Sequence, residues 1–297
     1  MNDDQTLRLR RLIARPGEPL LLPGAPNAIT ARIIEDLGFD AVYLSGAGIA
    51  NSYLGAPDIG LLSLPEIVGH VSATRDAVGL PIVVDGDTGF GNAINMQRTV
   101  RLFERAGASG IQIEDQVAPK RCGHFSGKAV ISAEEMIGKV KAATDARVDD
   151  NFVIIARTDS RAVLGFDEAC DRAARYLDAG ADVAFIEAPR SVDELRSIPA
   201  RVPGPHLVNM VEGGLTPITP LAELGEFGFN IVLYANMAMR AAMTGMQSAL
   251  SHLLNAGDSI AINERIASWQ ERQRLVRKSV FDELGITYGN DMEENYE

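Results

Sequence analysis

The feature that most constrains the fold of this chain is a short phrase that recurs where its helical segments end. EDLGFDAV at 35–42, ERAGASGI at 104–111, LDAGADVA at 177–184 and GEFGFNIV at 225–232 share the same order of signals. In each, a glycine follows a helical pattern, and a strand-like run begins a few residues later. Glycine just past a helix end stops the helix and lets the chain turn into a strand. The recurrence predicts repeated βα units.

Apolar, strand-like runs alternate with helical patterns along most of the chain. The runs lie at 20–26, 40–46, 81–87, 110–116, 152–159, 183–189, 206–213 and 230–236. Helical patterns lie at 6–14, 28–37, 64–77, 94–106, 133–143, 166–179, 192–198 and 220–224. This alternation is typical of a (β/α)8 TIM-type barrel. A doubly wound open sheet is the alternative, but no glycine-rich phosphate fingerprint follows the first run.

The domain organisation is inferred from the absence of a linker between these units. No Pro- or Ser-rich linker divides residues 1–297, so we expect a single α/β-barrel domain. From 237 onward the pattern is purely helical and exceeds what one final barrel helix requires. Extra amphipathic helices with Met and Leu on one face usually cover a barrel or meet another subunit. We therefore expect 237–297 to be a helical C-terminal extension used in oligomer contacts.

Composition excludes several classes of partner. The chain has 297 residues, of which 46% are hydrophobic and 23% charged, with a formal net charge of −12 and no basic cluster. Nucleic acid is therefore not an expected partner. Cys122 and Cys170 are too few for a disulfide framework and suit a reducing compartment. No early apolar run is long enough for a signal peptide or a membrane span, so we expect a cytoplasmic protein with no membrane partner.

The segment 110–128, GIQIEDQVAPKRCGHFSGK, carries one of the two cysteines in a polar loop. Lys120, Arg121 and His124 flank Cys122, and nearby positive charge stabilises a thiolate. Two glycines in the loop would let it move. This pattern predicts a mobile loop with an acid/base cysteine. The alternative is a surface loop whose cysteine is incidental.

Polar residues collect where the predicted strands end. They are Ser45, Asp85, Asp87, Glu114, Asp115, Arg157, Asp159, Glu187 and Asn209. The carboxyl ends of the strands form the catalytic face of a barrel. Because unpaired buried charge is strongly disfavoured, so many charged groups at one rim indicate a shared functional site.

Asp85 and Asp87 stand at i and i+2 in VVDGDTGFGN, where an extended strand would place both carboxylates on one face. Such a pair, with no histidine or cysteine beside it, suits a hard divalent cation such as Mg²⁺. A capped turn is the alternative. Glu114 and Asp58 are candidates for orienting metal-bound waters.

Arg157 ends the almost wholly apolar run FVIIAR and needs an anionic partner there. It either pairs with Glu187 or Asp159, or binds a substrate carboxylate through two parallel hydrogen bonds. Both interactions are possible if Arg157 is paired in the free protein and the substrate carboxylate then separates this ion pair.

Four motifs together resemble the isocitrate lyase/phosphoenolpyruvate mutase superfamily. They are the loop PKRCGH, the turn DGDTGFGN, and the strand ends IEDQ and ARTD. The resemblance runs from about residue 20 to 245. KRCGH is typical of the members that cleave or form carbon–carbon bonds. The phosphorus–carbon mutases generally lack it, although carboxyphosphonoenolpyruvate mutase retains it.

The resemblance implies an α/β barrel, often a tetramer with exchanged C-terminal helices, that binds a small-molecule carboxylate. It implies Mg²⁺ or Mn²⁺ on Asp85, with Asp87 acting directly or through water. Cys122 would be the acid/base on the departing carbanion, and Arg157 and Glu187 would be further catalytic groups. The positions that would bind substrate are Ser45, Gly46, Ala47, Gly123, His124, Asn209 and Arg240.

The activity implied is retro-Claisen cleavage of a branched 2-hydroxy di- or tricarboxylate to pyruvate plus a carboxylate. Phe185 and Leu233 resemble the pocket of the 2-methylisocitrate lyases, where they leave room for a C2 methyl. Val211 replaces a threonine of those enzymes, and MVEGG is similar to 2,3-dimethylmalate lyase. The alternatives are oxaloacetate decarboxylation or hydrolysis, carboxyphosphonoenolpyruvate mutase chemistry, and a catalytically inactive binding subunit.

Overall fold

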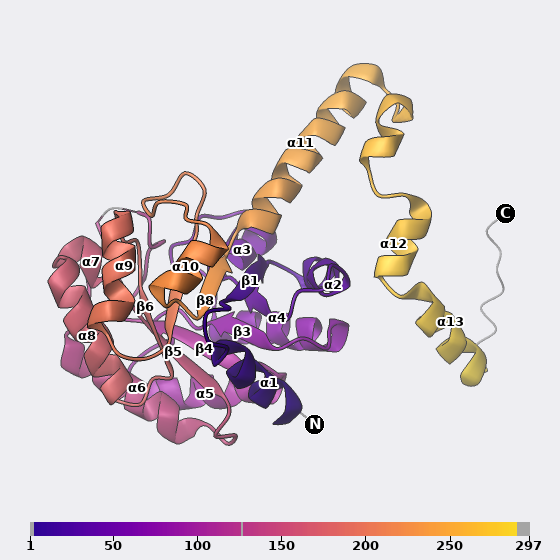
Figure 1. The fold of residues 1–297 in the computed structure, drawn as a ribbon. Coiled ribbons are helices and arrows are strands. Elements are labelled where there is room, and N and C mark those ends of the chain that lie inside the picture. The colour runs from indigo at the N-terminus through magenta and orange to yellow at the C-terminus, as the bar shows by residue number, and fades with distance from the viewer. Residues whose placement is uncertain (1–2, 126, 290–297) are drawn as a thin grey trace. The chain divides into compact units, whose positions relative to one another are not determined.

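The computed structural model describes residues 3–125 and 127–289, and its core is a closed barrel of parallel strands (Figure 1). The strands are β1 (Leu20–Ala25), β2 (Val42–Leu44), β3 (Ile82–Asp85), β4 (Gly110–Glu114), β5 (Val153–Thr158), β6 (Val183–Ile186), β7 (His206–Asn209) and β8 (Ile231–Tyr234). They pair in sequence order, and β8 returns to β1 with Leu22 opposite Leu233. The predicted (β/α)8 barrel is confirmed.

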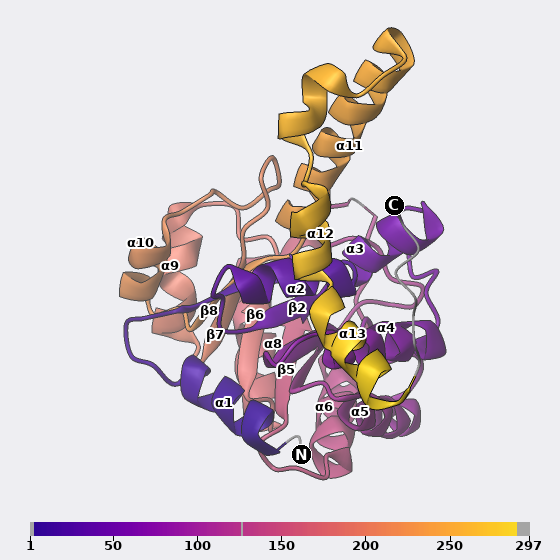
Figure 2. The same ribbon diagram turned by 90° about the vertical axis from the view of Figure 1, so that its right-hand side faces the viewer.

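Helices surround the barrel, as the turned view shows (Figure 2). They are α1 (Asp3–Ile13), α2 (Ala28–Asp36), α3 (Gly46–Ile49), α4 (Leu64–Ala77), α5 (Ala93–Ala106), α6 (Ala133–Ala146), α7 (Ser160–Val163), α8 (Phe166–Asp178), α9 (Val192–Arg201) and α10 (Leu221–Phe227), with a π-helix, η1, at Ala50–Leu54. In the recurring phrase, Gly107 and Gly228 end their helices at φ 98° and 103°. The phrase is therefore an αβ turn, as predicted.

The side chains of each strand alternate between the inside and the outside of the barrel. Tyr43 belongs to the interior cluster, whereas its neighbours Val42 and Leu44 belong to an outer one. The interior is filled by side chains from the strands and by Leu9 and Leu12 of α1. Because Leu9 approaches Gly110 at the start of β4, α1 closes the amino-terminal end of the barrel. The carboxyl-terminal end of the barrel, opposite α1, is where a functional site can form.

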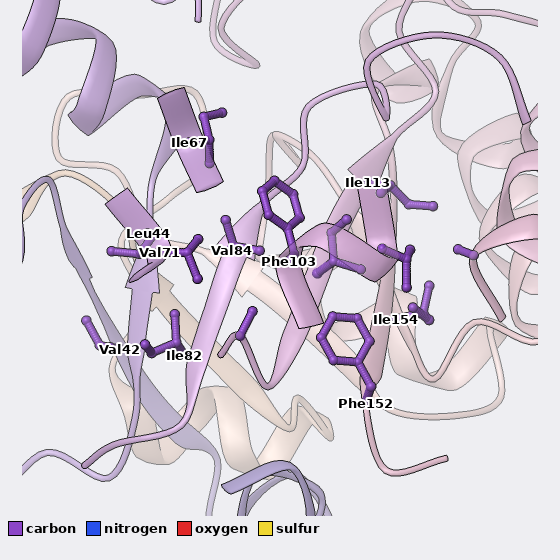
Figure 3. Packing of buried hydrophobic residues seen from close by; sticks show 14 of the residues in the cluster. Val42, Leu44, Ile67, Val71, Ile82, Val84, Phe103, Ile113, Phe152 and Ile154 are labelled. Atoms are coloured by element: carbon purple, nitrogen blue, oxygen red, sulfur yellow. The ribbon is translucent and has the colours of Figure 1, made fainter. Parts of the chain in front are cut away.

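The outer face of β2 to β5 packs against the helices that follow these strands (Figure 3). Leu44, Ile82 and Val84 point outward from their strands and share one cluster with Ile67 of α4 and Phe103 of α5. A second outer cluster joins β6, β7 and β8 to α8, α9 and α10. Strand side chains are thus buried on both faces, which explains the nearly continuous apolar runs in the sequence.

Several strands end earlier than the sequence pattern predicted. β3 ends at Asp85, β4 at Glu114 and β7 at Asn209, because the chain turns into loops there. The short helices α3, η1 and α7 in the loops after β2 and β5 were not predicted. All of these differences lie at the carboxyl-terminal rim.

Contacts divide the chain into two compact units, residues 1–239 and 240–297. The second holds most of α11 (Met237–Ala256), then the 3₁₀ helix η2 (Ile260–Arg265), α12 (Trp269–Leu275) and α13 (Lys278–Thr287). The helical extension predicted from residue 237 is therefore present. Its exposed apolar side chains include Met243, Met246, Leu250, Leu253, Leu254, Ile260, Trp269, Phe281 and Ile286. Within the described ranges, no helix is long and apolar enough to cross a membrane.

Candidate active site

Six strands deliver polar side chains to the carboxyl-terminal rim of the barrel. Ser45 follows β2, Asp85 ends β3, Glu114 ends β4, Arg157 lies in β5, Glu187 follows β6 and Asn209 ends β7. Asp85, Glu114, Arg157 and Glu187 are all buried. The shared location predicted from the sequence is therefore observed.

Asp85 and Asp87 converge on Gly46. The backbone N–H groups of Gly46 and Asp87 donate to the two oxygens of Asp85 at 3.2 and 3.1 Å. A Cβ on Gly46 would lie 3.1 Å from Asp85 Oδ2 and 3.2 Å from Asp87 Oδ1, so only glycine leaves this space open. The extended-strand explanation for the pair was wrong, because Asp87 lies past β3 in a turn at φ 46°. Aspartate tolerates this left-handed conformation better than most residues.

The ammonium group of Lys120 lies against two carboxylates of this region. Its Nζ is 2.5 Å from Asp58 Oδ1 and 2.9 Å from Asp87 Oδ1, and all three side chains are largely buried. Burial raises the pKa of Asp87 to about 7, although Lys120 opposes that rise. Lys120 thus faces the carboxylate pair, a role that its position beside Cys122 in the sequence did not indicate.

The carboxylate pair fits a magnesium ion better than a fully protein-ligated metal. Among residues 3–125 and 127–289, no three His, Cys, Asp or Glu side chains gather as a metal site. Mg²⁺ typically takes one or two carboxylates and completes its shell with water and substrate oxygens. Asp85 and Asp87 can provide those two ligands. Oε1 of the neighbouring Glu114 is buried without a hydrogen-bond partner among the described residues, which suits a water-mediated contact.

Arg157 is held mainly by Asp159. Its Nε and Nη2 donate to Asp159 Oδ2 and Oδ1 at 2.9 and 3.0 Å. Glu114 Oε2 lies 3.3 Å from Nη1, and Glu187 Oε1 lies 4.0 Å from Nη2. The guanidinium also stacks on Phe185, 5.4 Å from the ring centre. Of the two ion-pair partners considered from the sequence, Asp159 is the closer.

The loop that carries Cys122 is fixed by hydrogen bonds at Arg121 and at Cys122 itself. Gln116 donates to the carbonyl of Arg121 at 2.8 Å and accepts from its N–H at 2.9 Å. The N–H of Cys122 donates to the carbonyl of Asp58 at 3.1 Å. These bonds hold the backbone of Cys122 close to Asp58, whose carboxylate binds Lys120.

Gly123, the next residue, packs directly on the opposite side of the site. A Cβ at this position would clash with Glu187 Oε1 and with Nη2 of Arg157. The absence of a side chain therefore lets the loop approach both groups closely. Cys122 lies in the chain between this contact and the contact of Lys120 with Asp87.

The surroundings of Cys122 favour the protonated thiol over the thiolate. Burial raises the pKa of the thiol, and the nearby carboxylates of Asp58 and Glu187 raise it further, whereas Arg157 lowers it. The sequence interpretation that flanking cations stabilise a thiolate was wrong, because the ammonium of Lys120 is directed to carboxylates instead. A protonated thiol is the form that a general acid needs.

His124 is oriented by the loop after β7. Its Nδ1 accepts a hydrogen bond from the backbone N–H of Leu215 at 3.1 Å, so the proton of the neutral ring is on Nε2. Nε2 lies 3.3 Å from Glu187 Oε1. Gly214 passes so close that a Cβ there would lie 2.8 Å from the imidazole ring. The loops after β4 and β7 therefore meet over the site.

The remaining predicted residues occupy the rim or lie outside this unit. Ser45 caps α3, which contains Gly46 and Ala47, and its hydroxyl donates to Asn236 Oδ1 at 3.2 Å. Asn209 Oδ1 is buried and has no hydrogen-bond partner within the described ranges. Arg240 belongs to the second unit, so its substrate contact stays a prediction.

Sequence reasoning missed three polar residues near the site. The hydroxyl of Tyr43 donates to Gln112 Oε1 at 2.7 Å inside the barrel, below Glu114. Lys128 bonds to Asp159 at 2.7 Å. Tyr43 and Gln112 interrupt apolar strands, which was an available signal, whereas Lys128 looks like an ordinary loop lysine.

The comparisons with known proteins agree with this geometry. Residues 9–254 match the family model described as phosphoenolpyruvate phosphomutase. The chain belongs to the phosphoenolpyruvate mutase/isocitrate lyase superfamily. This superfamily assignment is the one that the four sequence motifs predicted.

Individual relatives cover nearly the whole chain. It is 43% identical to 2,3-dimethylmalate lyase of Eubacterium barkeri over 289 residues, covering 97% of each chain. It is 44% identical to 2-methylisocitrate lyase of Aeropyrum pernix over 270 residues, covering 91% of this chain and 86% of the relative. It is 41% identical to the chloroplastic carboxyvinyl-carboxyphosphonate phosphorylmutase of Arabidopsis thaliana, covering 95% and 84%.

Solved structures show the same architecture. Oxaloacetate acetylhydrolase with the inhibitor 3,3-difluorooxalacetate has a TM-score of 0.92 and 32% identity, covering 98% of this chain and 99% of that one. A 2,3-dimethylmalate lyase has a TM-score of 0.92 and 32% identity, and the match covers 98% of this chain and 97% of that one. Phosphonopyruvate hydrolase in complex with oxalate and Mg²⁺ has a TM-score of 0.86 and 30% identity, and the match covers 96% of this chain and 99% of that one. The chain is thus an enzyme of the carbon–carbon lyase type, as expected from its sequence.

Proposed function

We propose that this protein is a Mg²⁺-dependent lyase that cleaves a branched 2-hydroxy di- or tricarboxylate to pyruvate and a second carboxylate. The favoured substrate is 2,3-dimethylmalate, followed by 2-methylisocitrate. Similarity to both named lyases supports the class of substrate. The Mg²⁺ and oxalate bound by a similar solved structure support the cofactor, and Mn²⁺ is the second choice.

One observation carries the proposal. Cys122 stands between two contacts of its own loop, Lys120 with Asp87 and Gly123 with Arg157 and Glu187. A substrate held between these groups would have a protonated thiol beside it. Loop cysteines of a purely structural kind have no reason to occupy such a position.

The 2-hydroxy acid end would lie between Arg157 and the Asp85–Asp87 pair. Arg157 would bind its carboxylate through the guanidinium N–H groups that Asp159 does not occupy, because the guanidinium is positively charged and planar. When bound, Mg²⁺ would supply positive charge for the hydroxyl and carboxylate oxygens. The backbone at Gly46, which has no side chain, leaves room for those oxygens beside both aspartates.

Cleavage would then proceed in two proton-coupled stages. A base takes the proton of the C2 hydroxyl and passes it to solvent, the C2–C3 bond breaks, and C2 becomes the carbonyl carbon of pyruvate. The electron pair of the broken bond stays with C3 and its carboxylate as an enediolate. Cys122 delivers the thiol proton to C3, which gives the saturated acid, and the thiolate takes one proton back from solvent. General-acid help of this kind is worth about 10²–10⁴-fold in rate.

His124 would bind the departing end, with Glu187 beside it. The Nε2–H of His124 is a donor, and Leu215 keeps the ring in that form. The departing fragment of 2,3-dimethylmalate carries one carboxylate and that of 2-methylisocitrate carries two. The first therefore needs fewer hydrogen-bond donors from the protein. Val211, which precedes this loop contact, offers no hydroxyl, and this favours the dicarboxylate 2,3-dimethylmalate over the tricarboxylate 2-methylisocitrate.

The experiment is a comparison of products from three substrates. Purified protein with Mg²⁺ is given 2,3-dimethylmalate, 2-methylisocitrate and oxaloacetate, and pyruvate, propionate, succinate, oxalate and acetate are quantified. We expect pyruvate and propionate in equal amounts from 2,3-dimethylmalate, with the highest kcat/KM. Oxalate with acetate from oxaloacetate, and no pyruvate from the other two, would disprove lyase function.

Oxaloacetate hydrolysis is the second candidate, and one comparison favours it specifically. An oxaloacetate acetylhydrolase has a TM-score of 0.92 against this chain. The same rim would then bind oxaloacetate through Arg157. The product analysis above separates the two activities directly.

We also propose that the enzyme is a cytoplasmic homotetramer. The exposed apolar residues of the second unit, among them Leu254, Trp269 and Phe281, support a subunit contact, since such side chains gain by burial. Light scattering of the full-length protein should give the mass of four chains. Two cysteines, both free among the described residues, are consistent with a reducing compartment.

A further inference from the structure

Lys128 lies where the Cys122 loop returns to the barrel, and its ammonium group is buried. The side chain is only 2% exposed, and Nζ lies 2.7 Å from Asp159 Oδ1, whose side chain is fully buried. The same ammonium donates to the carbonyl oxygen of Gly123. Burying an ammonium is unfavourable unless it is paired and hydrogen-bonded, so this placement is specific.

Asp159 is shared between two cations. Its Oδ1 accepts from both Lys128 and Arg157, and its Oδ2 accepts from Arg157. Although burial by itself raises the pKa of Asp159, Arg157 and Lys128 hold it below its ordinary value. The backbone N–H of Asp159 donates to Asp115 Oδ1 at 2.9 Å, which fixes the backbone from which this carboxylate extends.

This sharing changes the charge available to substrate. A carboxylate paired with Arg157 alone would neutralise it. Because Lys128 also binds Asp159, this carboxylate offsets less of the charge of Arg157 than it would if Lys128 were absent. Glu114 and Glu187 lie near the same guanidinium whether or not Lys128 is present, so the contribution of Lys128 is separate from theirs. Lys128 would therefore raise the affinity of Arg157 for an anion.

The bond to Gly123 has a separate consequence. Gly123 follows Cys122 directly and packs on Arg157 and Glu187. One ammonium therefore holds both the backbone beside the thiol and the carboxylate that orients Arg157. Loop position and guanidinium charge are controlled through the same atom.

We propose that Lys128 is a positioning residue that couples the Cys122 loop to the anion-binding strength of Arg157. The inference rests on the proposed function, in which Arg157 binds the substrate carboxylate and Cys122 is the acid. Lys128 itself touches no reacting atom. A purely structural lysine would affect stability without changing anion affinity or the protection of Cys122.

Three substitutions separate these roles. Lys128→Met removes the charge and keeps the aliphatic stem, Lys128→Gln keeps a hydrogen-bond donor without charge, and Lys128→Arg keeps the charge. Lys141→Met is the matched control, because Lys141 is exposed on α6. Thermal unfolding of each full-length variant identifies those that fold. If Lys128→Met does not fold, Lys128→Gln gives the same test.

Two measurements follow, neither of which depends on turnover. Calorimetry with oxalate in the presence of Mg²⁺ measures anion affinity. Mass spectrometry after iodoacetamide treatment measures alkylation of Cys122, with the buried Cys170 of α8 as the internal reference. We expect Lys128→Met to weaken oxalate binding and to speed alkylation of Cys122, each about tenfold or more. Lys128→Arg should recover most of both, and Lys141→Met should behave as the unaltered protein.

Unchanged oxalate affinity together with unchanged alkylation in a folded Lys128→Met or Lys128→Gln variant would overturn the proposal. Equal acceleration at Cys170 would overturn it as well, because general loosening would then be the cause. If the lyase assay fails but the Lys128 variants still weaken oxalate binding and speed Cys122 alkylation, only the proposed reaction is rejected. The lyase reaction and the positioning role of Lys128 can therefore be disproved independently.

Discussion

The ammonium nitrogen of Lys120 lies 2.9 Å from Oδ1 of Asp87, in a buried region that also contains Asp58. The chain thus supplies a positive charge to the carboxylates that would bind a divalent cation. Without it, closely spaced buried carboxylates would repel one another and take up protons. This ion pair opposes the protonation of Asp87 that burial favours.

Asp87 is expected to contribute strongly to metal affinity. Asp87→Asn removes the charge with little change in shape, and we expect Mg²⁺ affinity to fall about 10–100-fold. Titration of Mg²⁺ by calorimetry in the presence of oxalate measures this. Asp40→Asn, at an exposed carboxylate, is the control and should change nothing. Equal Mg²⁺ affinity in both variants would exclude Asp87 as a ligand. Chelation with EDTA should abolish pyruvate formation, and added Mg²⁺ should restore it.

Cys122 is expected to act in proton transfer and not in binding. Cys122→Ser keeps a small polar group but replaces the thiol with a much weaker acid, so turnover should fall by about 10²–10⁴-fold. Oxalate affinity and thermal stability should stay the same. Cys170→Ala, in the core of α8, should retain turnover. A Cys122→Ser enzyme with full activity would leave the thiol without a catalytic role.

The hydrogen bond from the backbone of Leu215 to His124 can be removed without changing His124. Leu215→Pro deletes the N–H that Nδ1 accepts, whereas Leu215→Ala retains it and shortens a side chain that is 44% exposed. Loss of one such bond is worth about 1 kcal/mol, or roughly fivefold in kcat/KM. Steady-state kinetics should show this loss for proline alone. Equal kinetics for both variants would mean that the ring is oriented by other contacts.

The pH dependence of stability should carry a signature of His206. Burial lowers the pKa of His206 below its ordinary value of 6.5, although the bond between Nε2 and the carbonyl of Val202 opposes this. Above that pH, His206 is neutral in both the folded and unfolded states and has no effect. Below it, the unfolded chain binds a proton that the folded chain does not, so stability falls as pH falls.

The slope can reach about 1.4 kcal/mol per pH unit for one such group. Urea unfolding between about pH 7.5 and 5.5 measures it. His206→Gln cannot gain the proton and should give a shallower slope. Two groups that titrate in this range remain in the variant and contribute a residual slope. His70, whose pKa is also lowered by burial, gives a slope of the same sign, and Asp87, whose pKa burial raises to about 7, gives a slope of opposite sign. An identical slope in both proteins would show that His206 is not the group responsible.

The comparison of sequence and structure is most instructive at Asp85 and Asp87. Their convergence was predicted, but for the wrong reason, because a turn and not an extended strand brings them together. At Cys122 the local charge pattern gave the wrong sign of the pKa shift. Neighbours in the sequence were counted as neighbours in space, whereas burial and two distant carboxylates decide that pKa.

The sequence by itself determined the barrel, the rim and most of the residues on it. Alternating apolar patterns and glycine-ended helices specify βα units through local chemistry, and eight such units close on themselves. Only the tertiary structure decided which charges meet. Lys120 reaches Asp58 across 62 positions and Lys128 reaches Asp159 across 31. Pairings of this kind depend on loop paths and side-chain burial, which no short stretch of sequence encodes.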